Sequence, residues 1–496
     1  MNRTAIRPVP ANLLAVAIIA LAPGFTLAWE AARTKMALAR PTPEQRAFQD
    51  LEVGAFFHFG LKTCLHTSNP DGQAPASGFN PVALNAEQWI LTAKSMGAKY
   101  AVLTARHEDG FCLWPTKTTD YSLKHSPYQN GNGDVVREFV AACRKYGLKP
   151  GFYHTATFDA RHRLKPEDKS DSAKANSSPT ESEAWQKYRD IQVGQITELL
   201  LNYGPIDYLW FDHWVGTDPT YHAVTDTARR LQPHCVMLGP DTWVTGTEMG
   251  FVVYPMWNAV NTIDGTIYSR PARTAADATV PNDYGLLETD ALTGHPLGKF
   301  WRSREADSTA FYQGGWFWHP GKVSSGTVAE HLDLYYRTVG LGANLILNLP
   351  PDDRGLEAEA VVSAAKTFGD ELLRRFSQPI AELTGAQQGN TVELDWDKAT
   401  EINTVLLMEN IADGQKVAQY ALEAWVNGQW TALKAANRFN KAPSPFNPNP
   451  GFETIGHKKL DRIEPVVTNR LRFRCLKAVA EPVQLRRLAV FNCPSW

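Results

Sequence analysis

The stretch Tyr208–Trp214 (YLWFDHW) decides the fold, because it joins the end of a buried strand to a lone carboxylate, Asp212. The residues before it read as the tail of a helix that Gly204 and Pro205, two strong helix breakers, bring to an end. Ile206–Phe211 is then a short, largely apolar run, typical of a strand buried in a parallel sheet. Asp212 falls where this strand ends. Barrels of alternating strands and helices carry their catalytic groups at the C-terminal ends of strands. Asp212 is therefore a candidate catalytic residue, and a loop aspartate without function is the alternative.

Strands and helices alternate on both sides of this stretch, which predicts an α/β fold of the (β/α)₈ barrel type. We expect strands at 53–59, 100–104, 149–154, 206–211, 235–238, 315–318 and 344–349. We expect helices at 86–95, 135–145, 183–201, 222–231 and 329–339, and a further one from residue 357. The pattern is blurred at 245–312, which we interpret as long loops over the barrel mouth.

The pattern changes after about residue 377, where helical periodicity gives way to alternating strands. The runs TVELDW, INTVLLME, YALEAWV and RLRFRCL alternate in this way, and Asn427-Gly428 is a turn signal. This predicts a β-sandwich. We therefore expect a catalytic barrel over 40–376 and a C-terminal β-sandwich over 377–496.

The N-terminus has the features of a secretory signal peptide over residues 1–28. Arg3 and Arg7 form a positive region, an apolar stretch follows, and Thr26–Ala28 offers small residues for cleavage. The apolar stretch is too short and too interrupted to predict a membrane span. We expect a secreted or periplasmic protein with no membrane partner once the peptide is removed, and an uncleaved anchor is the alternative.

Charge and cysteine content exclude some classes of function. The net charge is −2 and no basic run occurs, so nucleic acid is not an expected partner. The six cysteines show no spacing suited to zinc, and no other cofactor is implied. Cys475 and Cys493 could form a disulfide, and free buried thiols are the alternative.

Polar side chains follow four successive expected strands, and core packing does not explain this, because burying unpaired charge is costly. The side chains are His58, His107, Glu108, Asp109, Tyr153, His154 and Asp212. They would line one barrel mouth. Metal-dependent hydrolysis is the weaker interpretation, since no ligand spacing supports it. Glycoside chemistry fits better and needs a second carboxylate. The candidates within 245–312 are Glu248, Glu288, Asp290, Glu305 and Asp307.

Five segments in the same order resemble the family 29 glycoside hydrolases, the retaining α-L-fucosidases, and look closest to their plant and bacterial branch. The segments are GAFFHFG, RHEDGF, IDYLWFD, READSTAFYQGGWFWHP and LGANLILNLPPDDRGL. The resemblance runs from about residue 40 to the C-terminus. It implies a barrel with a C-terminal β-sandwich, and removal of a terminal α-L-fucosyl residue from a glycan or glycoside by double displacement.

The resemblance also implies roles for individual residues. Asp212 matches the nucleophile, and Glu305 matches the acid/base, with Glu248 as its main rival. We expect Glu305 to be held protonated by an apolar surround and to lie roughly 5–5.5 Å from Asp212, as in retaining enzymes. The residues implied in sugar binding are His58, His107, Glu108, Tyr153, Trp210, Trp243 and Trp316.

Three departures from the family pattern bear on the choice of sugar. Glu108 replaces the second of two histidines, the 63–79 loop lacks a Glu-Trp pair, and His213 replaces a glycine after the nucleophile. A carboxylate only accepts hydrogen bonds at neutral pH, whereas a histidine can donate one. The alternatives are therefore an α-L-glucosidase or α-L-galactosidase on the same scaffold. An inactive secreted carbohydrate-binding protein is an alternative from another class.

Overall fold

The computed structural model describes residues 37–67, 72–155, 160–161, 183–212, 219–239, 242–248, 250–261, 293–322, 325–436 and 452–495. The expected signal peptide lies outside these residues. No helix in the described part of the chain is both long enough and apolar enough to cross a membrane. Leu38–Trp496 form one compact unit, so the division into domains at residue 377 stays a prediction.

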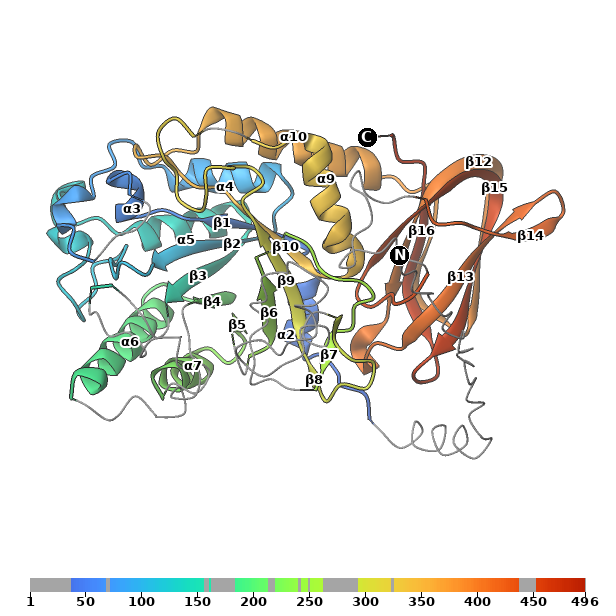
Figure 1. Ribbon diagram of the computed structural model, residues 1–496, viewed down its shortest axis with the longest axis horizontal. Coiled ribbons are helices and arrows are strands. Elements are labelled where there is room, and N and C mark those ends of the chain that lie inside the picture. The colour runs from blue at the N-terminus through green and yellow to red at the C-terminus, as the bar shows by residue number, and fades with distance from the viewer. Residues whose placement is uncertain are drawn as a thin grey trace, which may run out of the picture. The chain divides into compact units, whose positions relative to one another are not determined.

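The first part of the chain forms a closed barrel of parallel strands, which confirms the (β/α)₈-type fold (Figure 1). The order around the barrel is β1-β10-β9-β6-β5-β4-β3-β2. The strands are β1 (Val53–Phe57), β2 (Tyr100–Arg106), β3 (Lys149–Thr155), β4 (Tyr208–Asp212), β5 (Val236–Leu238), β6 (Val244–Thr247), β9 (Ser303–Ser308) and β10 (Asn344–Asn348). The strand that decided the prediction is thus β4, and Asp212 is its last residue.

Helices follow most of these strands, and several of them begin at side-chain caps. Asn85 and Asp134 each accept a hydrogen bond from a backbone N–H in the first turn of the helix that they precede. The α-helices are α2 (Pro43–Gln49), α3 (Leu61–Cys64), α4 (Ala86–Ser95), α5 (Val135–Tyr146), α6 (Glu183–Leu201), α7 (Pro219–Leu231), α9 (Val328–Arg337) and α10 (Glu359–Phe376). Short 3₁₀ helices are η1 (Ala76–Gly78), η2 (Leu123–His125), η3 (Tyr128–Gly131), η5 (Val339–Leu341) and η6 (Ile411–Asp413).

The structure corrects two expectations in and just after the blurred region. The segment 245–312 includes most of β6 and all of β9, and a short antiparallel pair, β7 (Ala259–Val260) and β8 (Phe300–Trp301), lies between them. The expected strand at 315–318, just beyond that region, is instead irregular backbone with a bend at Trp316 and Phe317. The reason for the first miss is that β9 reads SREADS, so a strand buried along nearly its whole length has almost no apolar side chains.

The barrel interior is aromatic and is closed at its N-terminal end. Phe48 of α2 lies 5.5 Å from the Tyr100 ring and 4.8 Å from the Tyr208 ring, measured between ring centroids. A Cβ atom on Gly54 would lie 2.3 Å from the Tyr100 ring, so β1 needs a glycine there. Side chains therefore fill the lower part of the barrel.

The last part of the chain forms one antiparallel sheet that folds over itself as a sandwich. Its order is β11-β16-β12-β15-β13-β14. Register shifts interrupt the long β12–β15 pairing. Val392 and Val405, on either side of the shifts, belong to the same buried apolar cluster. The strands are β11 (Ala381–Gln388), β12 (Thr391–Glu409), β13 (Val417–Val426), β14 (Gln429–Ala432), β15 (Lys459–Ala478) and β16 (Gln484–Phe491). All six cysteines are free thiols, including Cys475 and Cys493.

An ion pair joins the residue before β15 to the residue before β1. Lys458 Nζ lies 2.8 Å from Glu52 Oε1, and both side chains are largely buried. Burial acts to raise the pKa of Glu52, but the charge and the hydrogen bond of Lys458 outweigh it, so the pKa is lowered. A lowered folded-state pKa means that this stabilisation is present above the ordinary value of 4.5 and is lost as the pH falls further.

We expect Lys458→Met to lower the free energy of unfolding at pH 7 by about 3 kcal/mol, because it leaves the Glu52 carboxylate buried without its cation. Urea denaturation measures the loss. The matched control is Lys145→Met, which removes an exposed ion pair with Glu87 and should cost less. Equal losses in the two variants would show that the Glu52 pair contributes no more than a surface contact.

Candidate active site

Asp212 lies at the C-terminal end of β4 and is held by a neighbouring strand. The Tyr153 hydroxyl donates a hydrogen bond of 2.7 Å to Asp212 Oδ2. Burial raises the pKa of Tyr153 well above its usual value, and the Asp212 charge raises it further. The phenol therefore keeps its proton and remains a donor to the carboxylate.

Three flat side chains form a stack beside Asp212, which we call the ring stack: Trp210, Tyr153 and His107. The Trp210 and Tyr153 centroids lie 5.5 Å apart with an interplanar angle of 20°. The Tyr153 and His107 centroids lie 5.0 Å apart at 5°. Because Tyr153 is between the other two, its hydroxyl has a fixed direction toward Asp212.

His58 follows β1 and presents a defined tautomer. Its Nδ1 lies 2.8 Å from Asn348 Oδ1, and the Asn348 amide nitrogen in turn donates 2.8 Å to the Trp316 carbonyl oxygen. Burial lowers the pKa of His58 to about 3, and Lys62 lowers it as well. The ring is thus neutral with its proton on Nδ1, which leaves Nε2 as a hydrogen-bond acceptor.

Sequence reasoning missed a buried cation in this site. Lys62 Nζ lies 2.5 Å from Glu108 Oε1, and the exposed fractions of the two side chains are 4% and 23%. The same Nζ lies 5.0 Å from the centroid of the Phe317 ring, whose edge faces His107. Nothing in the sequence marks Lys62, because the pattern around it is that of an ordinary loop lysine.

The structure corrects the expected position of Glu305. Its carboxylate is only 1% exposed and accepts hydrogen bonds inside the barrel from Tyr208 and Trp210, each at 3.0 Å. These two residues precede Asp212 by four and two positions on β4. Both donors are at the tips of long side chains, so these contacts place the Glu305 carboxylate inside the barrel, among residues that precede Asp212 on β4.

The depth of Glu305 has a chemical consequence. Burial raises its pKa to about 7 despite the hydrogen bonds that lower it, so the expectation of a raised pKa holds. An acid/base must, however, contact the leaving oxygen and later a water molecule. A carboxylate sealed below the mouth does not suit that role.

Glu248 and Asp307 are two further carboxyl groups of the site. Glu248 directly follows β6 and is exposed, whereas Asp307 points inward from β9 and is buried. Burial is the largest cause that raises the pKa of both Tyr153 and Asp307, and the charges of Glu248 and Asp212 raise both further. Asp212, Glu248 and Asp307 therefore share one electrostatic environment at the mouth.

The two remaining expected binding residues lie at different ends of the barrel. Trp316 is at the mouth, with its ring centroid 5.0 Å from that of His58. Trp243 directly precedes β6, and its carbonyl oxygen accepts a hydrogen bond from Gln45 of α2. That contact places Trp243 at the closed end, so its expected contact with the sugar is corrected: it lies on the wrong side of a packed interior.

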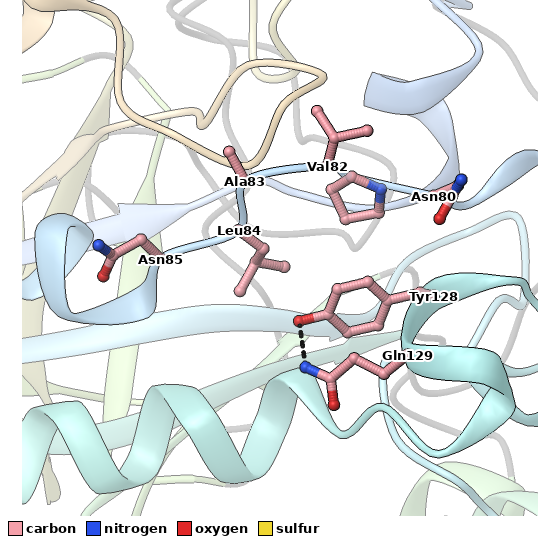
Figure 2. Close-up of a pocket in the computed structure, with 8 residues that line it drawn as sticks. Asn80, Val82, Ala83, Leu84, Asn85, Tyr128 and Gln129 are labelled. Carbon is pink, nitrogen blue, oxygen red and sulfur yellow. Dashed lines mark hydrogen bonds between the residues drawn. The ribbon is translucent and has the colours of Figure 1, made fainter.

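A surface pocket outside this site is shown in Figure 2. It lies between the loops that follow β1 and β2, and none of the site residues above lines it. Gln129 Nε2 donates 3.0 Å to the Tyr128 hydroxyl, and Asn85 caps α4. Its lining residues are Asn80, Pro81, Val82, Ala83, Leu84, Asn85, Tyr128 and Gln129. The polar side chains named here already have partners, so this pocket is not a second candidate for the active site.

Comparison with known proteins agrees with this geometry. Residues 73–373 match the family model described as alpha-L-fucosidase. The chain is 28% identical over 489 residues to Alpha-L-fucosidase 1 of Arabidopsis thaliana, an alignment that covers 90% of this chain and 86% of that protein. It is 26% identical over 276 residues to the plasma alpha-L-fucosidase of Homo sapiens, which covers 55% of this chain and 50% of that protein.

Solved structures give the same result. A glycoside hydrolase 29 family member from an unknown rumen bacterium is 28% identical, with a TM-score of 0.73 over 93% of this chain and 79% of that one. A structure from Bacteroides ovatus is 31% identical, with a TM-score of 0.75 over 94% of this chain and 76% of that one. These matches define the protein as a glycoside hydrolase. Because the family model covers more than half of its length, the chain belongs to the alpha-L-fucosidase family.

Proposed function

We propose that this protein removes terminal α-L-fucosyl residues from glycans or glycosides by double displacement with net retention. The observation that carries the proposal is Asp212 at a barrel strand end, held by Tyr153 in a pocket of histidine and aromatic side chains. The family membership supports it. No cofactor enters the chemistry.

In the first step Asp212 attacks the anomeric carbon. A bond forms between a carboxylate oxygen and that carbon, while the bond to the leaving oxygen breaks and takes a proton from the acid/base. In the second step the acid/base residue removes a proton from a water molecule. The water oxygen then attacks the anomeric carbon and releases Asp212. The sugar leaves with its original configuration after two inversions.

We assign the acid/base role to Glu248 rather than to Glu305. Glu248 is exposed at the mouth, where it can contact both a leaving group and water. Its charge acts on Tyr153, the residue that binds Asp212. Glu305 is buried among Tyr100, Tyr208 and Trp210, where neither a leaving group nor water contacts it.

The sugar-binding wall consists of His58, His107, Glu108, Tyr153 and Trp316. Neutral His58 would accept a hydrogen bond from a sugar hydroxyl through Nε2. Aromatic faces such as Trp316 suit the C–H face of a pyranose. Trp210 lies one layer deeper, where it supports Tyr153 and does not itself contact the sugar.

A hydrolysis assay tests the proposal. Aryl α-L-fucoside, α-L-glucoside and α-L-galactoside are compared with the Asp212→Ala variant as the blank, and NMR of the fresh product gives its anomeric configuration. We expect release from the fucoside and an α-configured sugar as the first product. Activity at the level of the blank on all three substrates would leave the inactive binding protein as the better description.

A second candidate function is the same reaction on an α-L-glucoside or α-L-galactoside. The observation that favours it is the Lys62–Glu108 ion pair in the sugar-binding wall. Lys62 holds Glu108 as a charged acceptor. The assay above decides between the candidates by the ratio of kcat/KM values, and Lys62→Met should change that ratio more than it changes kcat on the preferred sugar. An unchanged ratio would show that the pair has no part in sugar choice.

We also propose that the protein is exported. The support is the positive region, apolar stretch and small residues within positions 1–28. N-terminal sequencing of protein recovered from culture medium or periplasm tests this, and a mature chain that still begins at Met1 would contradict it.

A further inference from the structure

We propose that Glu305 is a positioning residue that holds Asp212 in place through Trp210 and Tyr153. The inference rests on the proposed function, because it takes Asp212 as the nucleophile. It gives a role to a buried carboxylate that the double displacement itself does not use.

The two oxygen atoms of Glu305 have separate partners. Oε1 accepts from the indole N–H of Trp210 and from the Tyr208 hydroxyl, each at 3.0 Å. Oε2 accepts from the Tyr100 hydroxyl at 2.5 Å. Oε1 therefore contacts the ring stack through Trp210 as well as Tyr208, whereas Oε2 contacts Tyr100, which Phe48 covers at the closed end of the barrel.

The bond to Oε1 fixes the orientation of Trp210 within the plane of its ring. An indole in an aromatic core can slide or rotate in its plane at little cost in packing, because dispersion attraction has weak directionality. A hydrogen bond loses most of its strength when its angle falls toward 120°, so the N–H bond prevents that motion.

Tyr153 transmits this constraint to Asp212. Its ring lies against Trp210 on one side and His107 on the other, and Phe56 lies 5.8 Å from it between centroids. The Tyr153 hydroxyl then donates to Asp212 Oδ2 at 2.7 Å. A shift of Trp210 would move the donor that orients the nucleophile, and small misplacements of reacting groups are costly in rate.

Four variants test the proposal. Glu305→Gln keeps an acceptor for Trp210 and can donate to Tyr100, so kcat should stay within about threefold of wild type. Glu305→Met removes the acceptor at similar volume, and kcat should fall by roughly 10- to 100-fold with KM within about threefold. Trp210→Phe should reproduce Glu305→Met, and the double variant should be no slower than either single one.

The matched control is Tyr100→Phe, which removes a hydrogen bond to the same carboxylate on the side away from the ring stack. It should lower Tm while leaving kcat and KM unchanged. If Tyr100→Phe and Glu305→Met lost activity alike at equal loss of Tm, Glu305 would be structural only. An unchanged kcat in Glu305→Met would also overturn the proposal.

Crystal structures separate this inference from the proposed function, because they need no turnover. In Glu305→Met the Tyr153–Asp212 distance should exceed hydrogen-bond length, whereas in Tyr100→Phe it should stay near 2.7 Å. An inactive wild-type protein would contradict the proposed function but not this inference. An unchanged Tyr153–Asp212 hydrogen bond in Glu305→Met would contradict this inference but not the proposed function.

Discussion

Asp212→Gly should hydrolyse an aryl α-L-fucoside roughly 10⁴-fold more slowly than wild type, or slower still, because the covalent intermediate can no longer form. Azide should restore part of the activity. The side chain lies at the mouth and is partly exposed, so its removal leaves room for a small anion beside the anomeric carbon. Azide attacks from the face that Asp212 used, and the product is therefore a β-L-fucosyl azide.

The control for this experiment is Tyr153→Phe, which keeps the ring stack but removes the hydrogen bond to Asp212. It should lose far less activity than Asp212→Gly and gain nothing from azide, because the nucleophile is still present. Undiminished turnover in Asp212→Gly, or an azide product with retained configuration, would mean that another group attacks the sugar.

Glu248→Ala should lose roughly 10²- to 10⁴-fold in kcat/KM on a fucosyl disaccharide, whose leaving alcohol needs a proton. On a dinitrophenyl fucoside, whose leaving group departs without help, the first step should be nearly unaffected, and the second step then limits kcat. Azide needs no general base, so it should restore turnover here with retained configuration.

Glu305→Ala is the comparison that settles the acid/base assignment. We expect its loss to be similar on good and poor leaving groups and to be insensitive to azide, because a buried positioning residue affects both alike. A strong dependence on the leaving group in Glu305→Ala, together with its absence in Glu248→Ala, would return the role to Glu305.

Much of the barrel could be predicted from the sequence, because its parallel strands and helices have distinct periods. The helices at 86–95 and 183–201 were predicted to the residue. β9 could not be found in this way, because Glu305 and Asp307 are polar side chains inside the barrel, where tyrosine and tryptophan donors bind Glu305. A buried strand is normally recognised in a sequence by its apolar side chains. In β9 hydrogen bonds from other strands take the place of apolar packing, and the sequence does not show them.

The site was predicted less completely, because a motif places a residue along the chain but not in depth. Asp212 and His58 follow their strands and lie at the mouth as expected. Glu305 lies within β9, and Trp243 lies before a strand of only four residues, so both are deeper than their motifs indicate. Lys62 is the opposite case. No motif marks it, and it belongs to the site because it forms an ion pair with Glu108, which is distant in sequence.

The closed lower end of the barrel, where Phe48 packs on Tyr100 and Tyr208, means that a substrate reaches Asp212 from the mouth side of the barrel. Approach from one side suits a chain terminus, which agrees with removal of single end residues. It also imposes an order of events. The aglycone departs first and clears the way for water, and the freed monosaccharide must then leave by the same opening before another chain end enters. Accumulated monosaccharide should therefore act as a competitive inhibitor.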